Sequence, residues 1–169
     1  MKMVINNATE CRVVSWLRTI LGEDRVVHQY YANWCRNPST NRMLPFDIYI
    51  PHLNVVIEVD GPQHFNTIKR KWGSAKSIRA RDVVKMKACI DNGVAMIRVP
   101  QEEAAKKTGT NWKYELCSTF TFLAWTTYYH HPIVIGCDSA LYKKHMAELS
   151  DATGTGSIGK CPRRARNAR

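Results

Sequence analysis

The apolar positions along the chain divide it into helical and extended segments. In residues 6–22 they recur every three or four residues and form one stripe of a helix, which Gly22 can end. Shorter segments rich in Val, Ile and aromatic residues indicate strands. The patterns predict helices over 6–22, 80–92 and 111–132, strands over 25–32, 44–50, 55–61 and 94–100, and a polar loop over 33–42. The Thr and aromatic residues of 111–132 leave a strand as the alternative there.

The order of these segments predicts an α/β fold. A strand, a helix and a further strand form a crossover, which makes 94–100 a parallel or mixed neighbour of the hairpin formed by 44–50 and 55–61. We therefore expect a mixed central sheet with an N-terminal helix, a β-hairpin, a crossover helix and a C-terminal helix. A single domain over 1–150 holds these elements. Residues 151–169, which are Gly-rich and then basic, are expected to form a flexible tail.

The predicted hairpin separates apolar from acidic residues. Folding it about residues 51–54 opposes Ile48 to Ile57 and Asp47 to Glu58. Because side chains alternate along a strand, one face then carries only apolar residues, namely Ile48, Ile50, Val55, Ile57 and Val59. The opposite face carries Asp47, Glu58 and Asp60.

These carboxylates need a partner. Directly opposed residues have Cβ atoms about 4.5–5.5 Å apart, so Asp47 and Glu58 repel each other unless a cation or a proton lies between them. A divalent metal would resolve the conflict, and hard oxygen ligands without a Cys or His cluster favour Mg²⁺ or Mn²⁺. The alternative is the polar face of a half-exposed sheet, whose acids pair with nearby Arg and Lys.

The net charge of +11 is concentrated in two stretches. Residues 66–87 contain eight basic residues and one acid, and residues 157–169 contain five basic residues and no acid. Such blocks bind polyanions by releasing counterions, which makes nucleic acid the leading partner, with a solvated basic face as the alternative. The candidate nucleic-acid-binding residues are Lys69, Arg70, Lys71, Lys76, Arg79, Arg81, Arg163, Arg164 and Arg166.

Other features of the composition narrow the class of protein. The chain has no 18-residue apolar segment and no apolar block near its first residue, so we expect a soluble, intracellular protein in the nucleus or the cytoplasm. Its six cysteines include no C-x-x-C pair, which argues against a zinc ribbon. We expect reduced thiols, with Cys11, Cys89 and Cys117 packed in the core.

Three segments resemble the PD-(D/E)xK restriction-endonuclease-like superfamily, particularly its very-short-patch-repair-like branch and small viral and phage nucleases. They are "PFDIYIP", "IEVDGPQHF" and "RDVVKMKACIDNGVAMIRVP", and the resemblance covers about residues 7–100. It implies a restriction-endonuclease-like core and a Mg²⁺-dependent enzyme that hydrolyses phosphodiester bonds, with DNA favoured over RNA. It also implies that Asp47 and Glu58 are metal ligands and that Glu10 is an additional acid of the site. The alternative for Glu10 is a capping box with Asn7.

The chain departs from the superfamily at one position. Asp60 stands where the superfamily usually has Lys, which polarises the scissile phosphate or the attacking water. Gln63, His64 and Lys85 are the candidates to replace that Lys. The alternatives are a capping or core hydrogen bond for His64 and an ion pair of Lys85 with Asp82 on the same helix. The candidate catalytic set is therefore Glu10, Asp47, Glu58, Asp60, His64 and Lys85.

Three other functions fit the same sequence. "VDGPQHF" also resembles the RAP domain, a restriction-fold module of organellar RNA-binding proteins that would bind RNA without catalysis. A structure-selective Holliday-junction resolvase shares the fold and the small size, and would require a homodimer. A structural or packaging protein would use only the basic tail. Metal-dependent cleavage distinguishes the enzymes from the binding proteins.

Overall fold

The structure of the chain is a computed structural model that describes residues 8–65, 75–105, 111–126, 132–136 and 139–154. Its helices are α1 (Ala8–Leu21), α2 (Ala75–Asp91), α3 (Gln101–Ala105), α4 (Trp112–Trp125) and α5 (Lys143–Thr153). Its strands are β1 (Val27–Arg36), β2 (Met43–Ile50), β3 (Val55–Asp60), β4 (Ala95–Pro100) and β5 (Ile133–Val134). The strands form one mixed sheet in the order β1-β2-β3-β4-β5, antiparallel from β1 to β3 and parallel from β3 to β5. The predicted α/β fold is confirmed.

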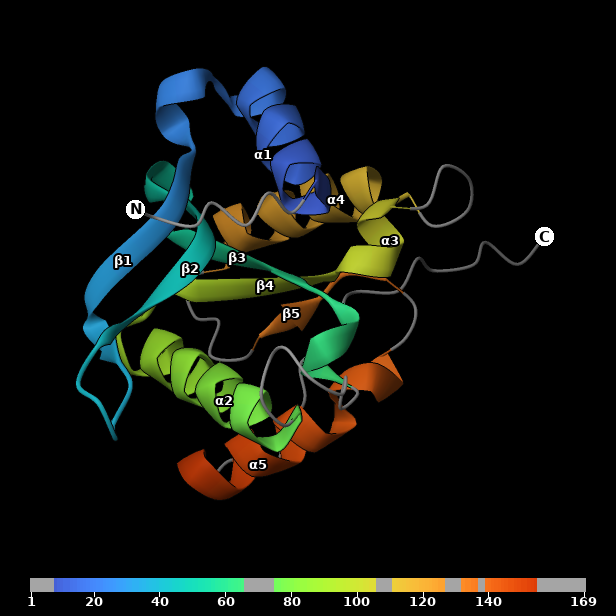
Figure 1. The fold of residues 1–169 in the computed structure, drawn as a ribbon. Coiled ribbons are helices and arrows are strands. Elements are labelled where there is room, and N and C mark those ends of the chain that lie inside the picture. Colours follow the sequence, from blue (N-terminus) through green and yellow to red (C-terminus); the bar gives the residue numbers. More distant parts are fainter. Residues whose placement is uncertain (1–7, 66–74, 106–110, 127–131, 137–138, 155–169) are drawn as a thin grey trace.

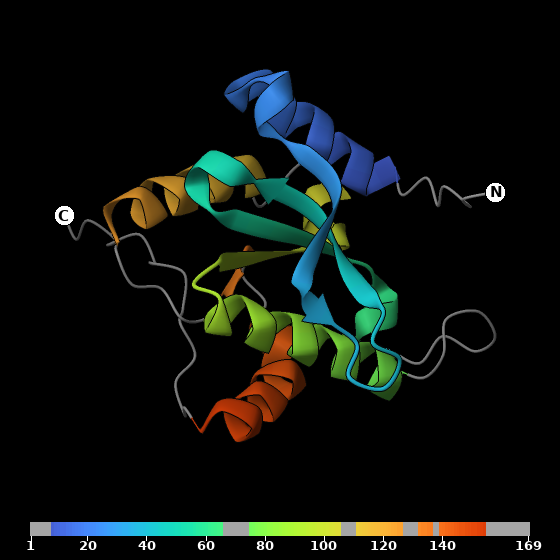
Figure 2. The same cartoon turned by 90° about the vertical axis from the view of Figure 1, so that its left-hand side faces the viewer.

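Helices cover both faces of the sheet. In Figure 1, α1, α3 and α4 lie on one face and α2 and α5 on the other, and the view of Figure 2 agrees. Each layer has its own apolar core. The first core contains Leu17 of α1 and Ile57 of β3, and the second contains Met86 of α2, Met146 of α5 and Val56 of β3. Alternate residues of β3 thus face different cores, because successive side chains of a strand point to opposite sides.

The register of the β2–β3 hairpin is the predicted one. Ile48 pairs with Ile57, and Ile50 pairs with Val55. All five residues of the predicted apolar face lie in the first core. The opposite face of β3 is also covered, since Glu58 and Asp60 are each only 2% exposed. The alternative is therefore wrong about exposure for these two acids, but the pairing with Lys and Arg that it expected is observed, since Glu58 contacts Lys85 and Asp60 contacts Arg98.

β1 and β2 form a ribbon that passes from one core to the other. Phe46 of β2 lies in the second core, whereas Ile48 lies in the first. The change falls at Asp47, and Figure 1 shows the ribbon running from the α1 side of the sheet to the α2 side. In β1 the residue across from Asp47 is Gln29, whose φ of 56° interrupts the extended strand. The ribbon therefore bends beside one of the candidate site residues.

Two elements are longer than the sequence predicts. β1 continues to Arg36 through residues predicted as a polar loop, because Ala32 and Cys35 are buried in the second core. α2 begins at Ala75 instead of residue 80, and Ile78 gives the added turn a buried position. The helix predicted for 111–132 is observed over Trp112–Trp125, which form α4, and the strand alternative is wrong for this part of the segment.

The C-terminal part contains one helix that the sequence did not predict. α5 buries His145, Met146 and Leu149, so the predicted boundary between residues 150 and 151 falls inside a packed helix. The predicted basic tail lies outside the described residues from residue 155 onward. None of the described helices is both long and apolar enough to span a membrane.

The cysteine prediction is partly wrong. Cys89 is buried as expected, together with Cys35, but Cys11 and Cys117 are exposed. Cys11 lies on α1 away from the stripe formed by Val13, Val14 and Leu17, which is the part of that helix that the first core buries.

Candidate active site

Asp47 and Glu58 lie where the β2–β3 ladder ends. The last backbone pair is Ile48 with Ile57. Beyond it the carboxyl groups accept hydrogen bonds from the opposite strand: the Val59 N–H donates to Asp47 Oδ2 at 2.8 Å, and the Asp47 N–H donates to Glu58 Oε1 at 3.3 Å. These crossed hydrogen bonds hold both carboxyl groups at the open end of the ladder.

Lys85 reaches this pair of acids from α2. Its Nζ donates to Glu58 Oε2 at 2.8 Å and lies 5.5 Å from the centre of the Phe46 ring. The side chains of Lys85 and Glu58 are only 12% and 3% exposed. The predicted alternative, an ion pair with Asp82 on the same helix, is wrong, because Lys85 pairs with Glu58.

Glu10 approaches the same end of the sheet from the first turn of α1. Its Oε1 lies 2.7 Å from His28 Nε2 and accepts a hydrogen bond from Gln29 Nε2 at 2.6 Å. Gln29 is the residue with positive φ across from Asp47, so this unusual backbone conformation coincides with the contact to Glu10. Glu10 therefore points toward β1 of the sheet, while Asn7 of the proposed capping box lies outside the described residues.

The electrostatics of these groups favour a cation. Burial and the neighbouring Glu58 carboxylate raise the pKa of Asp47 well above its ordinary value, and the charge of Glu10 adds to the effect. Burial also raises the pKa of Glu58, although the Lys85 ammonium opposes that shift. Burial alone would lower the pKa of Lys85, but Glu58 and Asp47 raise it, so Lys85 stays charged. One ammonium thus faces the buried Glu58 and the half-buried Asp47, and a further positive charge would be stabilised beside them.

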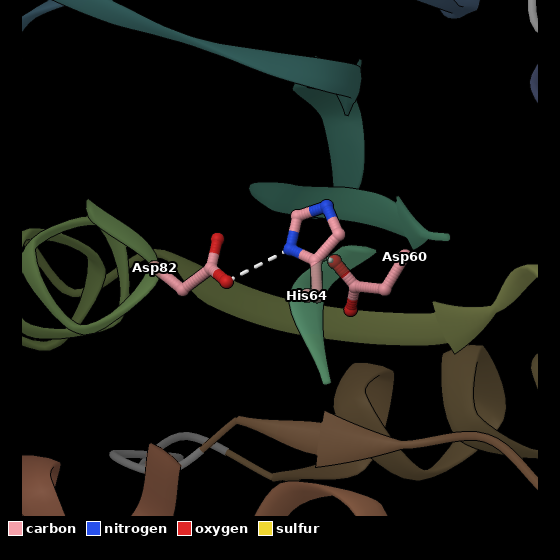
Figure 3. A group of neighbouring side chains, drawn as sticks. All are labelled: Asp60, His64 and Asp82. Carbon is pink, nitrogen blue, oxygen red and sulfur yellow. Dashed lines mark hydrogen bonds and ion pairs between the residues drawn. The ribbon is translucent and has the colours of Figure 1, made fainter. Parts of the chain in front are cut away.

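Asp60 and His64 belong to a second network, which is centred on Arg98 of β4. Arg98 Nε and Nη2 donate to the two oxygens of Asp60 at 2.7 and 2.6 Å, and Nη2 lies 3.3 Å from Asp82 Oδ1. His64 Nδ1 lies 2.8 Å from Asp82 Oδ2, as Figure 3 shows. The Tyr142 hydroxyl completes the set by donating to Asp60 Oδ2 at 2.6 Å.

This network is close to electrically balanced. Burial alone would raise the pKa of Asp60, but Arg98 and His64 lower it. The pKa of Asp82 is also lowered, against burial, by Arg98, His145 and His64. Burial would lower the pKa of His64, but the hydrogen bond to Asp82 and the charge of Asp60 raise it. Both acids therefore already have their cationic partners.

By residue type, the second network also resembles a metal site. Asp60, His64 and Asp82 bring three ligand atoms within 4.8 Å of one another (Figure 3). However, Arg98 bonds both oxygens of Asp60 and contacts Asp82, and His145 Nε2 lies 3.2 Å from Asp82 Oδ2. A metal would have to displace a fully buried guanidinium, so these residues fit a cation less well than Asp47 and Glu58 do.

The candidate nucleic-acid-binding residues are in different situations. Lys76 and Arg81 of α2 are exposed. Arg79 is tied to α5 instead, because its Nε donates to Glu148 Oε1 at 2.6 Å and its side chain is 14% exposed. The other candidates lie outside the described residues, namely Lys69, Arg70, Lys71, Arg163, Arg164 and Arg166.

Several residues of these networks were absent from the predicted site. Arg98 had a signal in the sequence, since a charge between Ile97 and Val99 in an otherwise apolar strand requires a buried partner. Tyr142 and His145 had none, because they reach the network only through the packing of α5, and of the turn just before it that contains Tyr142, against the second core.

Comparison with known proteins adds little to this geometry. The chain is 34% identical over 68 residues to an uncharacterised protein, 033L, of Invertebrate iridescent virus 3. The match covers 38% of this chain and 35% of the viral protein. No family model matches the chain, and no solved structure matches it.

Proposed function

We propose that the chain is a metal-dependent endonuclease that hydrolyses phosphodiester bonds in DNA. The observation that carries the proposal is the 2.8 Å contact between Lys85 Nζ and Glu58 Oε2, next to Asp47. The PD-(D/E)xK resemblance calls for two acids and an ammonium, and the sequence has Asp60 where that ammonium is usual. Lys85 supplies the missing charge from a different element.

In this proposal each side chain has a defined task. Lys85 orients the attacking water and offsets the negative charge that develops on the phosphate, because it is charged and held in a site with little water. Since the pKa of Lys85 is raised, it acts as a charged donor and not as a general base. Glu58 holds the ammonium in place, and Glu10 adds negative charge behind Asp47.

Asp47 and Glu58 fit a hard divalent cation. They offer only carboxylate oxygens, and their raised pKa values reflect burial that a bound Mg²⁺ or Mn²⁺ would compensate. Among the described residues, hydrogen bonds to the Asp47 carboxylate involve Oδ2, which leaves Oδ1 for a cation. When bound, the metal would supply a Lewis acid for water activation and phosphate charge.

α2 links the proposed chemistry to DNA binding. Lys85 lies on the same helix as Lys76 and Arg81, whose exposed side chains can contact backbone phosphates. Phosphate contacts of this kind position the duplex without reading its sequence. The proposed partner is therefore the DNA backbone, and substrate shape would decide where the chain cuts.

The proposal is tested by a cleavage assay on linear, nicked, mismatched and four-way DNA and on RNA, in Mg²⁺, in Mn²⁺ and in EDTA. We expect cleavage of DNA only with metal, and losses of about 100-fold or more in Asp47→Asn and in Lys85→Met. Asp91→Asn on the exposed end of α2 is the matched control and should keep wild-type activity.

A folded wild type that cleaves none of these substrates would refute the proposal. Binding of RNA without cleavage would favour the RAP-like function, and a preference for four-way DNA would favour a resolvase.

A further inference from the structure

Arg98 joins β3 and α2, the two elements that carry Glu58 and Lys85 of the candidate active site. From the middle of β4 it bonds both oxygens of Asp60 on β3, at 2.6 and 2.7 Å, and contacts Asp82 on α2 at 3.3 Å. Its side chain is fully buried, with 0% of its surface exposed. Arg98 also has Glu58 as its register partner in the parallel β3–β4 ladder.

The contacts of Arg98 run beside the contact of Lys85 with Glu58. Asp60 lies two residues after Glu58 and points to the same side of β3. Asp82 lies three residues before Lys85 and therefore projects from the same face of α2. Both sets of contacts cross the same gap between β3 and α2. Any shift of α2 along the sheet that broke one would strain the other.

Stability alone does not explain this buried network. Replacing buried ion pairs by apolar residues is often neutral or stabilising, because charges lose hydration when they are buried. The apolar contacts of Met86 and Val56 in the second core already hold α2 against the sheet. Apolar packing tolerates small displacements, whereas a bidentate guanidinium–carboxylate pair fixes both distance and orientation. The network is therefore suited to setting a position.

We infer that Arg98 is a positioning residue, which holds Lys85 Nζ on Glu58 through Asp60 and Asp82. This inference rests on the proposed function and adds to it a residue that contacts neither Lys85 nor the substrate. Loss of the network should lower kcat, because a misplaced ammonium no longer meets the reacting phosphate. KM should change little, because the exposed phosphate-binding residues are left intact.

Two variants test the inference. Arg98→Lys keeps a charge but cannot bridge both acids. The triple variant Asp60→Asn, Asp82→Asn, Arg98→Met removes the guanidinium and both carboxylates together, and His64 can lose its proton once the carboxylates that raise its pKa are gone. The first measurement uses no substrate. It is the ¹H–¹⁵N signal of the hydrogen-bonded Lys85 ammonium, assigned by its absence in Lys85→Met. The second is kcat and KM for the DNA that the wild type cleaves. Asp91→Asn again serves as the control on α2.

We expect a weakened Lys85 signal and a kcat reduced about 10-fold in Arg98→Lys, and loss of the signal with a larger fall in kcat in the triple variant. A folded triple variant that keeps both the signal and the wild-type kcat would overturn the inference. Failure of both variants to fold would also overturn it, because the network would then be needed for folding itself. Because the signal is read without substrate, an inert wild type whose signal still depends on Arg98 would refute the hydrolase and keep the positioning role.

Discussion

Glu58 of β3 and Lys85 of α2 meet at 2.8 Å in a place where neither charge is well hydrated. This contact answers part of the problem posed by a strand that carries acids among Ile and Val. One of the two neighbouring carboxyl groups has an ammonium beside it. Asp47 does not share that hydrogen bond, and burial and the Glu58 carboxylate raise its pKa, so a further positive charge nearby would favour its ionised form. The same geometry that partly satisfies the acids thus leaves a place for a cation.

The first prediction concerns this pair. If Glu58 faced only Asp47, Glu58→Gln would relieve repulsion and leave the fold intact. Because Lys85 is bonded to Glu58, the substitution instead leaves a buried ammonium unpaired, and we expect a loss of about 3 kcal/mol in the free energy of unfolding. The double variant Glu58→Gln, Lys85→Met should lose less than the sum of the two single variants. Urea unfolding in EDTA measures the free energy of unfolding of the double variant and of the two single variants, Glu58→Gln and Lys85→Met.

An exposed pair on the same helix provides the control. Lys87 Nζ and Asp91 Oδ2 lie 2.7 Å apart with about half of each side chain exposed, at 43% and 52%. The corresponding cycle with Lys87→Met and Asp91→Asn should give a coupling below about 0.5 kcal/mol. Equal couplings for the two pairs would show that Glu58 and Lys85 do not form a buried ion pair in solution.

The second prediction follows from the pKa of Asp47, which burial and Glu58 raise. The unfolded chain then loses this proton at lower pH than the folded chain, so the free energy of unfolding falls as pH rises above the ordinary value of 3.8. Asp47→Asn escapes that loss, and its amide oxygen can still accept from the Val59 N–H. We expect the variant to be at least as stable as wild type at pH 7 in EDTA, with the difference vanishing below about pH 3.8. Thermal unfolding across this range is the measurement. A variant that is less stable at pH 7 would contradict the prediction.

The third prediction uses His64, whose pKa is raised by Asp82 and Asp60 although burial opposes the shift. A histidine with a raised folded pKa contributes stability that is fully present below its unfolded value of 6.5 and is lost as pH rises through the folded pKa. His64→Gln should therefore be most destabilising below pH 6.5 and progressively less so at higher pH. The measurement is denaturant unfolding of His64→Gln between pH 5.5 and 9. His52→Gln, at an exposed position, is the matched control, and the loss of unfolding free energy in the two variants is compared at each pH. A penalty that grows with pH would refute the assignment.

The sequence predicted the hairpin well for a physical reason. Period-two alternation in β2 and β3 and the short turn between them leave one register that buries every apolar residue, and Ile48 indeed pairs with Ile57. The pairing of Asp47 with Glu58 was only half right, because the ladder ends one residue earlier and the acids bond to backbone N–H groups instead. Local pattern sets the register but does not show where two strands part.

Contacts between distant elements were much harder to predict. Lys85 was one of three candidates for the missing ammonium, and only the packing of α2 against β3 distinguishes it from Gln63 and His64. The partners of Asp60 include Tyr142, which is 82 residues away in the chain. No local pattern marks such a contact. The β1 extension was missed for a similar reason, since Cys35 looks polar in sequence context but is fully buried in the second core.

The fourth prediction separates two arginines of α2 that sequence reasoning treated alike. Arg81 is exposed, so Arg81→Ala should weaken binding to duplex DNA and reduce the slope of log affinity against log salt by about 0.9. Arg79 is already engaged by Glu148, so Arg79→Ala should change the slope less and lower the unfolding free energy by about 1 kcal/mol or less. Fluorescence anisotropy at several salt concentrations, together with urea unfolding, tests both. Identical effects on the slope would show that Arg79 leaves Glu148 to contact phosphate.

The last prediction locates the metal. A ligand that binds only the folded state stabilises it, by about 2.7 kcal/mol at a hundredfold excess over Kd, so Mn²⁺ should raise the melting temperature of wild type relative to EDTA. If Asp47 and Glu58 hold the ion, Asp47→Asn should lose this increase, whereas His64→Gln should keep it, because His64 belongs to the network in which Arg98 already neutralises Asp60 and Asp82. The opposite result, a response lost in His64→Gln and kept in Asp47→Asn, would move the metal to the group formed by Asp60, His64 and Asp82. A wild type whose melting temperature is the same in Mn²⁺ and in EDTA would remove the metal from both sites, and with it the hydrolytic function proposed for Asp47, Glu58 and Lys85.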